Sequence, residues 1–476
     1  MRRTKIICTL GPAVDSEDMI RTLIRTGMDA ARFNFSHGSH AEHLERLNML
    51  KSVRDSMGRP VATILDTKGP EIRIKSFETK SITLEEGDVF TLTTEDIVGN
   101  QGWVSVTYPR LHEELSPGQE ILIDDGLVAI RVDRIEGVKI ICAVENGGTL
   151  SANKSINIPG VHIQLPALTE KDIDDIRFGV ENDFDFIAAS FVRRAADVKA
   201  VRAVLHECGG DDVKIIAKIE NQEGVDNLDE IMDAADGIMV ARGDLGVEIP
   251  AARVPILQKQ MIRKGLQAGK PVITATQMLD SMIRNPRPTR AEVSDVANAV
   301  YDGTGCVMLS GETAGGKYPV NALKAMVGIV TETEGAIDYW KQFQKQRIET
   351  SSDLNDAITH TCCLTAKDLE AKAILAATNS GRSARMICRF RPACSIAALT
   401  MHEKVRRQLN ISWGITPYLT GEVTSTDRIF SLATEVAVKE KLVQHGDVVV
   451  ITAGIPLGKS GCTNLIKAQV IDEEAM

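Results

Sequence analysis

The sequence of 476 residues contains no apolar run that approaches the roughly 20 residues needed to cross a membrane as a helix. The apolar run that follows the two N-terminal arginines ends at Pro12, which is too early for a signal peptide. Basic residues are not in excess, because the net charge is −10. This charge disfavours a broad surface for nucleic acid or for an anionic membrane. We therefore expect a cytoplasmic protein with neither nucleic-acid nor membrane partners.

The nine cysteines include no C-x-x-C pair, although Cys362 and Cys363 are adjacent. This scatter is typical of buried thiols in a reducing compartment and argues against disulfides or a zinc site. Hydrophobic residues make up 43% and charged residues 25%, as in a globular protein with a large core. The length predicts about three domains.

Short apolar runs recur along the chain, and most are followed by a segment with helical periodicity. Two of these helical segments begin with a capping box, at Thr169 with Asp172 and at Thr289 with Glu292. Eight such strand–helix units predict an α/β fold, a closed parallel (β/α)₈ TIM barrel, in preference to an open doubly wound sheet. The predicted strands are TKIICTL, AARFNFS, PVATILDT, FDFIAASFV, VKIIAKIE, GIMVARGD, PVITATQM and CVMLSGET.

The alternation is interrupted once, after the third predicted strand. There the pattern changes to period two with turn residues, which predicts a small inserted all-β domain over the barrel mouth, where it would act as a lid. After the charged stretch YWKQFQKQRIETSSD, the runs AILAATN, CSIAALT and DVVVITAG predict a C-terminal α/β domain. We thus expect a barrel at residues 1–69 and 168–340, a lid at 70–167 and a C-terminal domain at 341–476.

Polar and charged residues follow most of the predicted barrel strands, where barrel enzymes place their catalytic groups. Any one of them alone would more often be a structural ion pair or cap. Because eight parallel strands bring their C-terminal ends to one rim, we interpret the set as a functional site. Its members are Arg32, Asn34, Ser36, Asp66, Thr67, Arg73, Lys218, Glu220, Arg242, Asp244, Thr276, Gln277, Ser310 and Glu312.

Two carboxylates in this set, Glu220 and Asp244, end adjacent strands. Mg²⁺ takes one or two protein carboxylates and leaves its other positions to water and substrate oxygens. The absence of histidine and cysteine from the set disfavours zinc. Lys218 and Arg32 would lie beside this metal, with Arg73 at the start of the lid. Cations around Mg²⁺ suit a transferring phosphoryl group, whose negative charge must be stabilised.

Three other patterns are weaker. GETAGGKY has Tyr318 where a phosphate-binding P-loop needs serine or threonine, and GIPLGKS is one residue too short. His37, His40 and His43 are spaced so that they spread around the start of a helix, which argues against a shared metal.

Several strings in the sequence resemble the pyruvate kinase family along the whole chain. They are ARFNFSHG, LDTKGPEIR, IAKIENQEG, MVARGDLGVE, ITATQMLDSM, NPRPTRAE and VMLSGETAGGKYP. The resemblance implies transfer of the phosphoryl group of phosphoenolpyruvate to ADP, giving pyruvate and ATP. It also implies Mg²⁺ (or Mn²⁺) and K⁺ as cofactors, a homotetramer and regulation by a phosphorylated allosteric effector.

The resemblance also implies roles for individual residues. Arg32 and Lys218 would bind the phosphoryl group, and Glu220 and Asp244 would bind the divalent metal. The substrate carboxylate would lie on Gly243, Asp244 and Thr276, with Thr276 near the carbon that is protonated. The remaining roles are K⁺ binding by Asn34, Ser36, Asp66 and Thr67, and nucleotide binding by Asn34, His37, Arg73 and Lys154.

Glu71 is the residue on which the K⁺ requirement depends, since relatives with lysine at this position supply the positive charge themselves. The loop TNSGRSA resembles the family's effector-phosphate site, with Thr378, Ser380, Gly381, Arg382 and Ser383 as its residues. Two alternatives remain open from the residues: a Mg²⁺-dependent enolate lyase or mutase on a related barrel, and a non-catalytic metabolite sensor.

Overall fold

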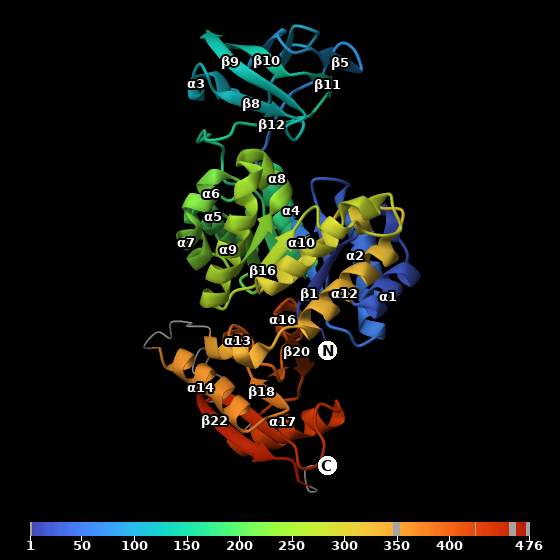
Figure 1. Ribbon diagram of the computed structural model, residues 1–476, viewed down its shortest axis with the longest axis vertical. Helices are drawn as coiled ribbons and strands as arrows, with labels where there is room; N and C mark the ends of the chain where they lie inside the picture. Colours follow the sequence, from blue (N-terminus) through green and yellow to red (C-terminus); the bar gives the residue numbers. More distant parts are fainter. Residues whose placement is uncertain (1, 346–352, 424, 457–462, 473–476) are drawn as a thin grey trace.

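A computed structural model describes residues 2–345, 353–423, 425–456 and 463–472. Figure 1 shows three parts stacked along the long axis of the molecule, with an all-β part at one end, a barrel in the middle and an α/β part at the other end. The N-terminus lies where the barrel meets the α/β part. None of the helices in the described ranges is long and apolar enough to cross a membrane.

The middle part is a closed barrel of parallel strands, as predicted. Both faces of these strands are buried, one against the outer helices and one inside the barrel, which explains their near-continuous apolar runs. All eight predicted strands are present: β1 Lys5–Thr9, β2 Ala30–Asn34, β3 Ala62–Asp66, β13 Phe186–Ala189, β14 Lys214–Ile219, β15 Gly237–Ala241, β16 Val272–Ala275 and β17 Cys306–Leu309.

Helices surround the barrel, and both predicted capping boxes are confirmed at the starts of α4 and α10. The helical elements of this part are η1 Pro12–Val14, α1 Glu17–Thr26, α2 His40–Ser56, α4 Glu170–Glu181, α5 Ala195–Glu207, α6 Gln222–Asp226, α7 Leu228–Ala234, α8 Arg242–Glu248, η2 Ala251–Arg253, α9 Val254–Ala268, η3 Asp280–Ile283, α10 Arg290–Tyr301, α11 Gly311–Ala314 and α12 Pro319–Gly335.

The inserted all-β part follows β3 and has its own apolar core. It contains a seven-stranded sheet of order β4-β12-β8-β9-β10-β6-β7 and a two-stranded sheet of β11 and β5. Its elements are β4 Ile72–Arg73, β5 Ser81–Leu84, β6 Val89–Thr93, β7 Trp103–Ser105, α3 Leu111–Glu114, β8 Glu120–Ile123, β9 Val128–Glu136, β10 Lys139–Asn146, β11 Gly148–Ser151 and β12 Ser155–Asn157.

The C-terminal part is a five-stranded sheet of order β20-β19-β18-β21-β22, in which only β21 and β22 pair antiparallel. The three predicted strands correspond to β18, β19 and β21, whereas β20 and β22 were not predicted. The elements are α14 Leu354–Asp368, β18 Ala373–Ala377, α15 Arg382–Cys388, β19 Ser395–Thr400, α16 Glu403–Leu409, β20 Ile415–Leu419, α17 Thr426–Lys439, β21 Val448–Gly454 and β22 Thr463–Val470.

The stretch predicted to be a simple charged link begins with helix α13, Tyr339–Lys345, and is not irregular there. Tyr339 and Phe343 are buried, and Tyr339 packs against Trp413 with the ring centroids 5.1 Å apart. These aromatic contacts explain the helix, which the charge pattern did not reveal. The domain boundaries at 69/70, 167/168 and 340/341 stay a prediction.

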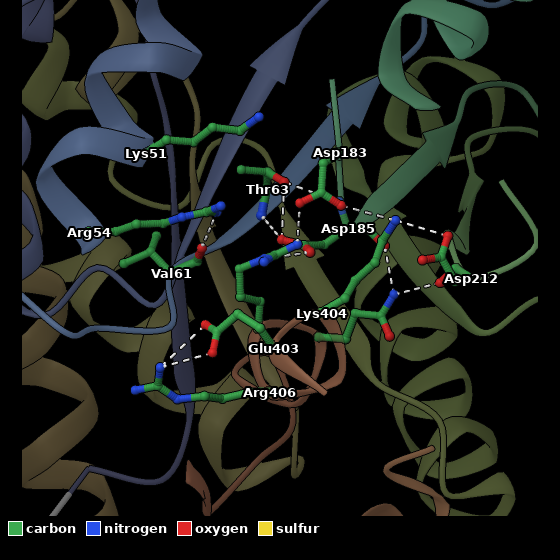
Figure 2. A network of polar contacts seen from close by, with 12 residues as sticks. Lys51, Arg54, Val61, Thr63, Asp183, Asp185, Asp212, Glu403, Lys404 and Arg406 are labelled. Carbon is green, nitrogen blue, oxygen red and sulfur yellow. Dashed lines mark hydrogen bonds and ion pairs between the residues drawn. The ribbon is translucent and has the colours of Figure 1, made fainter. Parts of the chain in front are cut away.

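Helix α16 attaches the C-terminal part to the barrel through a network of polar contacts (Figure 2). The Arg407 guanidinium donates to Asp185 Oδ1 at 2.8 Å and to Asp183 Oδ2 at 2.7 Å. Lys404 Nζ lies 2.9 Å from Asp212 Oδ1. Asp185 also accepts hydrogen bonds from the Thr63 amide and hydroxyl, so the network joins α16 to the N-terminal ends of β3 and β13.

Candidate active site

A cavity of about 430 Å³ lies between the lid sheet and the C-terminal end of the barrel. Its lining confirms that residues at the ends of several barrel strands meet residues of the lid at one place. The predicted site residues that line it are Arg32, Asn34, Ser36, His37, Arg73, Lys154, Lys218, Glu220 and Asp244. Asp66 and Thr67 are buried at the same end of the barrel, and Gly243 and Thr276 contact each other there.

The centre of the site is a chain of charged groups. Arg32 Nε donates to Asp66 Oδ2 at 2.5 Å, and Lys218 Nζ donates to Asp66 Oδ1 at 3.1 Å. Lys218 Nζ also lies 2.9 Å from Glu220 Oε1, in an ion pair without hydrogen-bond alignment. Asp66 and Glu220 are fully buried, and Lys218 is 8% exposed. Two carboxylates therefore hold two cations at the edge of the cavity.

Burial and neighbouring charges set the protonation of this cluster. Burial by itself would lower the pKa of the Lys218 ammonium, but Asp66 and Glu220 outweigh it and raise that pKa above its ordinary value. Burial would raise the pKa of Asp66, but Arg32 and Lys218 hold it below its usual range. Burial raises the pKa of Glu220 to about 7, with the Asp244 charge adding to the rise. A positive charge at Lys218 is thus strongly favoured, while Glu220 is a carboxylate that another cation would stabilise.

The Glu220 and Asp244 carboxylates fit a divalent metal. Glu220 Oε2 accepts a hydrogen bond from the Phe191 amide at 2.6 Å, whereas Oε1 has no hydrogen-bond partner in the described part of the chain. Both residues line the cavity. Within the described ranges no group of three histidine, cysteine, aspartate or glutamate side chains is placed to hold a metal. A two-carboxylate site is what Mg²⁺ or Mn²⁺ would use when substrate oxygens complete its coordination.

The residues predicted to bind K⁺ supply only oxygen ligands. Asn34 and Asp66 are direct neighbours in the register of β2 and β3, so their side chains end at the same level of the barrel. Asn34 Oδ1 accepts from the Ser36 amide at 3.2 Å, and the carbonyl of Thr67 follows directly in the chain. This set suits a hard monovalent cation. Asp66, however, already receives hydrogen bonds from both cations of the cluster.

The loop after β16 has a constrained backbone. Thr276 and Gln277 have φ values of 66° and 54°, in the left-handed region that costs energy for residues with a side chain. The Thr276 hydroxyl accepts a hydrogen bond from the Gly243 amide at 2.6 Å. Arg242 donates to the Thr276 carbonyl at 2.9 Å and pairs with Asp295 at 2.7 Å. Arg242 therefore holds this loop in place.

The four residues predicted to bind the nucleotide, Asn34, His37, Arg73 and Lys154, all line the cavity, and the two lid cations have acidic partners. Arg73 forms an ion pair with Glu71, with Nη2 2.6 Å from Oε2, and donates to the Asn153 carbonyl at 2.6 Å. Lys154 Nζ lies 2.9 Å from Asp124 Oδ1. His37 is exposed, and its carbonyl oxygen is 2.8 Å from His43 Nε2.

Ser190 and Phe191, which follow β13, were not among the predicted site residues. The Ser190 hydroxyl lies 2.7 Å from Lys218 Nζ, and the Phe191 amide binds Glu220. The string FDFIAASFV drew attention to the strand, but an apolar phenylalanine and a single serine carry no catalytic signal by themselves. Ser310 was among the predicted rim residues, and its hydroxyl is buried without a hydrogen-bond partner within the described ranges.

The predicted effector loop lies in the C-terminal part, between β18 and α15. Gly381 has a φ of 80°, and its amide donates to the Thr378 hydroxyl at 3.0 Å. Ser383 contacts Thr463 through their hydroxyls, and Arg382 lies 3.9 Å from Asp353. The Ser380 carbonyl oxygen accepts a hydrogen bond from the Arg385 guanidinium at 3.2 Å. Most of the string GIPLGKS, including its GKS, lies outside the described residues.

The histidine pattern has the structural role that was expected. His40 Nε2 lies 2.6 Å from Asp175 Oδ1, and His43 stacks on Phe35 with centroids 4.1 Å apart. The described cysteines are all free thiols, most of them buried.

Comparisons with known proteins agree with this arrangement. The family model described as pyruvate kinase, barrel domain, matches residues 1–323, and the model described as pyruvate kinase, alpha/beta domain, matches residues 356–469. A pyruvate kinase of Clostridium acetobutylicum is 49% identical over 473 residues, covering 99% of this chain and 100% of the relative. A pyruvate kinase of Geobacillus stearothermophilus is 49% identical over 474 residues, covering 99% of this chain and 81% of the relative.

A crystal structure of a pyruvate kinase from Cryptosporidium parvum is similar over 98% of this chain and 96% of that chain, with a TM-score of 0.94 and 40% identity. The family models cover both the barrel and the C-terminal sheet, and the relatives match over nearly the full sequence. The chain belongs to the pyruvate kinase family.

Proposed function

We propose that this chain transfers the phosphoryl group of phosphoenolpyruvate to ADP, giving pyruvate and ATP. The observation that carries the proposal is that two cations, Arg32 and Lys218, lie at one end of the barrel together with the Glu220 and Asp244 carboxylates. All four line a cavity large enough for small phosphorylated substrates. Membership of the family supports the same reaction.

The two cations act on the phosphoryl group. Its negative oxygens are held by the Arg32 guanidinium and the Lys218 ammonium, and Lys218 stabilises the charge that spreads over these oxygens during transfer. Because Asp66 holds both cations at 2.5 and 3.1 Å, they are oriented before substrate arrives. Such preorganisation avoids the cost of reorienting charges in the transition state.

Glu220 and Asp244 would hold Mg²⁺ or Mn²⁺, which would neutralise phosphate and enolate charge when bound. Asn34, Ser36, Asp66 and Thr67 would hold K⁺ with their oxygens. Both assignments rest on the chemistry of the oxygen donors and on their shared position at the end of the barrel.

The substrate carboxylate would lie at the start of α8, on the amides of Gly243 and Asp244. The Gly243 amide is bonded to the Thr276 hydroxyl, so a bound carboxylate would share or replace that contact. Thr276 would then lie beside the carbon that must be protonated, with water delivering the proton. The left-handed backbone at Thr276 fixes the direction of its hydroxyl.

The nucleotide would lie between Asn34 and His37 on the barrel and Arg73 and Lys154 on the lid. The lid cations would exchange Glu71 and Asp124 for nucleotide phosphates as the lid closes, which also excludes water from the transferring group.

Regulation would act through the C-terminal part. A phosphorylated effector would bind Thr378, Ser380, Gly381, Arg382 and Ser383. We further propose a cytoplasmic homotetramer whose barrel, lid and C-terminal domains divide as the sequence predicts.

The Mg²⁺-dependent lyase or mutase is not favoured. Such an enzyme would share Glu220 and Asp244 but would not need Arg73 and Lys154 on a lid that faces the cavity. A non-catalytic sensor would not need the buried Lys218–Asp66 pair.

An assay that couples pyruvate formation to NADH oxidation, with and without ADP, tests the proposal. Pyruvate formed only when ADP, Mg²⁺ and K⁺ are present supports it. Pyruvate formed equally without ADP would indicate a lyase or phosphatase, and no pyruvate under any condition would leave only the sensor.

A further inference from the structure

The turn Ser190–Phe191 contacts several residues of the proposed site. It follows β13, between the strands that end in Asp66 and Lys218. Its two residues bond to Thr67, Asp66, Lys218 and Glu220. These two residues thus contact Lys218, which is proposed to bind the phosphoryl group, and Glu220, which is proposed to bind the divalent metal. They also contact Asp66 and Thr67, which are proposed to bind K⁺.

The Ser190 hydroxyl has one hydrogen to donate, and the geometry indicates where it goes. Its Oγ is 2.6 Å from the Thr67 carbonyl and 3.3 Å from Asp66 Oδ1, so the shorter contact to Thr67 takes the hydrogen. The oxygen lone pairs are then free to accept from Lys218 Nζ at 2.7 Å. Asp66 Oδ1 accepts a second N–H of the ammonium at 3.1 Å, and Glu220 Oε1 lies 2.9 Å from Nζ as an ion pair.

The Phe191 backbone is the second component. Its φ of 54° lies in the left-handed region, where a bulky side chain is a clear outlier. This conformation aims the Phe191 amide at Glu220 Oε2, 2.6 Å away. Gly69 makes the turn sterically possible, because a Cβ at this position would lie 2.8 Å from Ser190 Cβ and 2.9 Å from Phe191 Cδ2.

We propose that Ser190 and Phe191 are positioning residues for the phosphoryl transfer. Ser190 fixes the direction of the Lys218 ammonium, and the Phe191 amide fixes the Glu220 carboxylate for the divalent metal. The proposal rests on the proposed function. Its physical basis is that a lysine head on a flexible four-carbon stem needs fixed acceptors to stay in one orientation, and that catalysis depends steeply on such orientation.

The Ser190→Ala variant tests the first component. Loss of a hydrogen bond to a charged group should lower kcat about 10- to 100-fold, while KM for phosphoenolpyruvate changes less than about threefold, because Arg32 still binds the phosphoryl group. The matched control is Thr304→Ala, which also removes a fully buried hydroxyl from the barrel, near β17 and away from the cavity. Thr304→Ala should lower the melting temperature but keep kcat.

Two outcomes would overturn this part of the proposal. A Ser190→Ala enzyme with the natural kcat would show that Ser190 does not position Lys218. Equal losses of kcat in the two variants, in proportion to their loss of folded protein, would show a purely structural role.

The Phe191→Gly and Phe191→Val variants test the second component. Each variant is titrated with Mn²⁺, and electron paramagnetic resonance measures how much Mn²⁺ is bound. Both remove the ring, but glycine adopts a positive φ readily and β-branched valine does not. The glycine variant should bind Mn²⁺ with a Kd within about threefold of the natural protein, and the valine variant should bind at least about tenfold more weakly, as for loss of a charged hydrogen bond. Weakened binding in the glycine variant, or natural binding in the valine variant, would contradict the proposal.

The Mn²⁺ titration also separates this proposal from the proposed function. A natural protein that forms no pyruvate would refute the proposed function, whereas the titration of the Phe191 variants would still report whether the amide positions Glu220.

Discussion

The two ends of the barrel both bury an aspartate beside cations, but they use the charges differently. At the C-terminal end, Asp66 holds Arg32 and Lys218 beside the open cavity. At the N-terminal end, Asp185 holds Arg407 beneath helix α16, where Figure 2 shows the surrounding network. Both aspartates are fully buried, and they lie on neighbouring strands.

The difference lies in whether a cavity adjoins the unsatisfied groups, since Arg54 Nε at the N-terminal end is also buried without a hydrogen-bond partner in the described part of the chain. Both Asp185 oxygens accept hydrogen bonds from Arg407 and Thr63, and the C-terminal part covers the end of the barrel. At the other end, Glu220 Oε1 and the Ser310 hydroxyl are buried without hydrogen-bond partners in the described part of the chain. A charged cluster therefore indicates a functional site when it combines unsatisfied groups with an adjoining cavity. A charged cluster that another part of the chain covers indicates an interface between domains.

The largest expected effect is at the open end. Lys218→Met should lower kcat about 10²- to 10³-fold or more, because it removes a preorganised charge from the transferring phosphoryl group. KM for phosphoenolpyruvate should change less, since Arg32 remains. Steady-state kinetics of the coupled reaction measure both. Near-normal turnover in this variant would show that the open cluster is not catalytic.

The next largest effect is expected at the N-terminal end of the barrel, which α16 covers. It should lower the free energy of unfolding and leave activity unchanged. Arg407→Met leaves Asp185 buried without its cation, which should cost about 3–5 kcal/mol. Calorimetry should show a lower melting temperature, with kcat per folded molecule nearly unchanged. Arg428→Met is the matched control in the same C-terminal part, because its side chain is 45% exposed and pairs with Glu435 on α17. That pair should contribute about 0–1 kcal/mol. Equal destabilisation by both variants would refute the role given to Arg407.

A charge reversal at the open end should change the cation requirement. The site already contains the carboxylates of Asp66, Glu220 and Asp244, and Glu71 adds another carboxylate, which pairs with Arg73. We expect the natural protein to be nearly inactive in a buffer with only a bulky organic cation and to recover with K⁺. Glu71→Lys would place an ammonium nearby and should remove much of this dependence. Activity is measured against K⁺ concentration at constant ionic strength. Full activity of the natural protein without a small monovalent cation would refute both the K⁺ site and the role of Glu71.

The smallest expected effect tests whether effector binding in the C-terminal part changes activity at the cavity, on the other side of the barrel. Ser383→Glu should repel a phosphorylated effector and abolish activation, while unactivated turnover stays largely intact. Coupling between two such sites typically amounts to about 1–3 kcal/mol. Phosphoenolpyruvate saturation curves, with sugar phosphates and nucleoside monophosphates as trial effectors, measure it. If no phosphorylated metabolite shifts the curve of the natural protein, the regulatory proposal is wrong.

The barrel and the rim of the site could be predicted from local patterns. Runs such as VKIIAKIE show which segments are strands buried on both faces, and the parallel arrangement brings Lys218, Glu220 and Asp244 to one end without any knowledge of their contacts. The all-β insertion was predicted for the same reason, since period-two alternation is a local property. The sequence by itself therefore determined the fold class, the end of the barrel where the cavity lies and nine of the residues that line the cavity.

Only the tertiary structure decided which side chains became partners. Asp66 joins Arg32 to Lys218 because the barrel places β2, β3, β13 and β14 side by side. Asp66 and Lys218 are separated by 152 positions in the sequence. Ser190 and Phe191 carry no signal of their own and acquire a role through the space that Gly69 leaves. Asp185, like Asp66, is a buried aspartate at the end of a barrel strand, yet α16 covers it. Periodicity specifies which face of a segment is buried, but the long-range packing that selects each partner is set only when the whole chain folds.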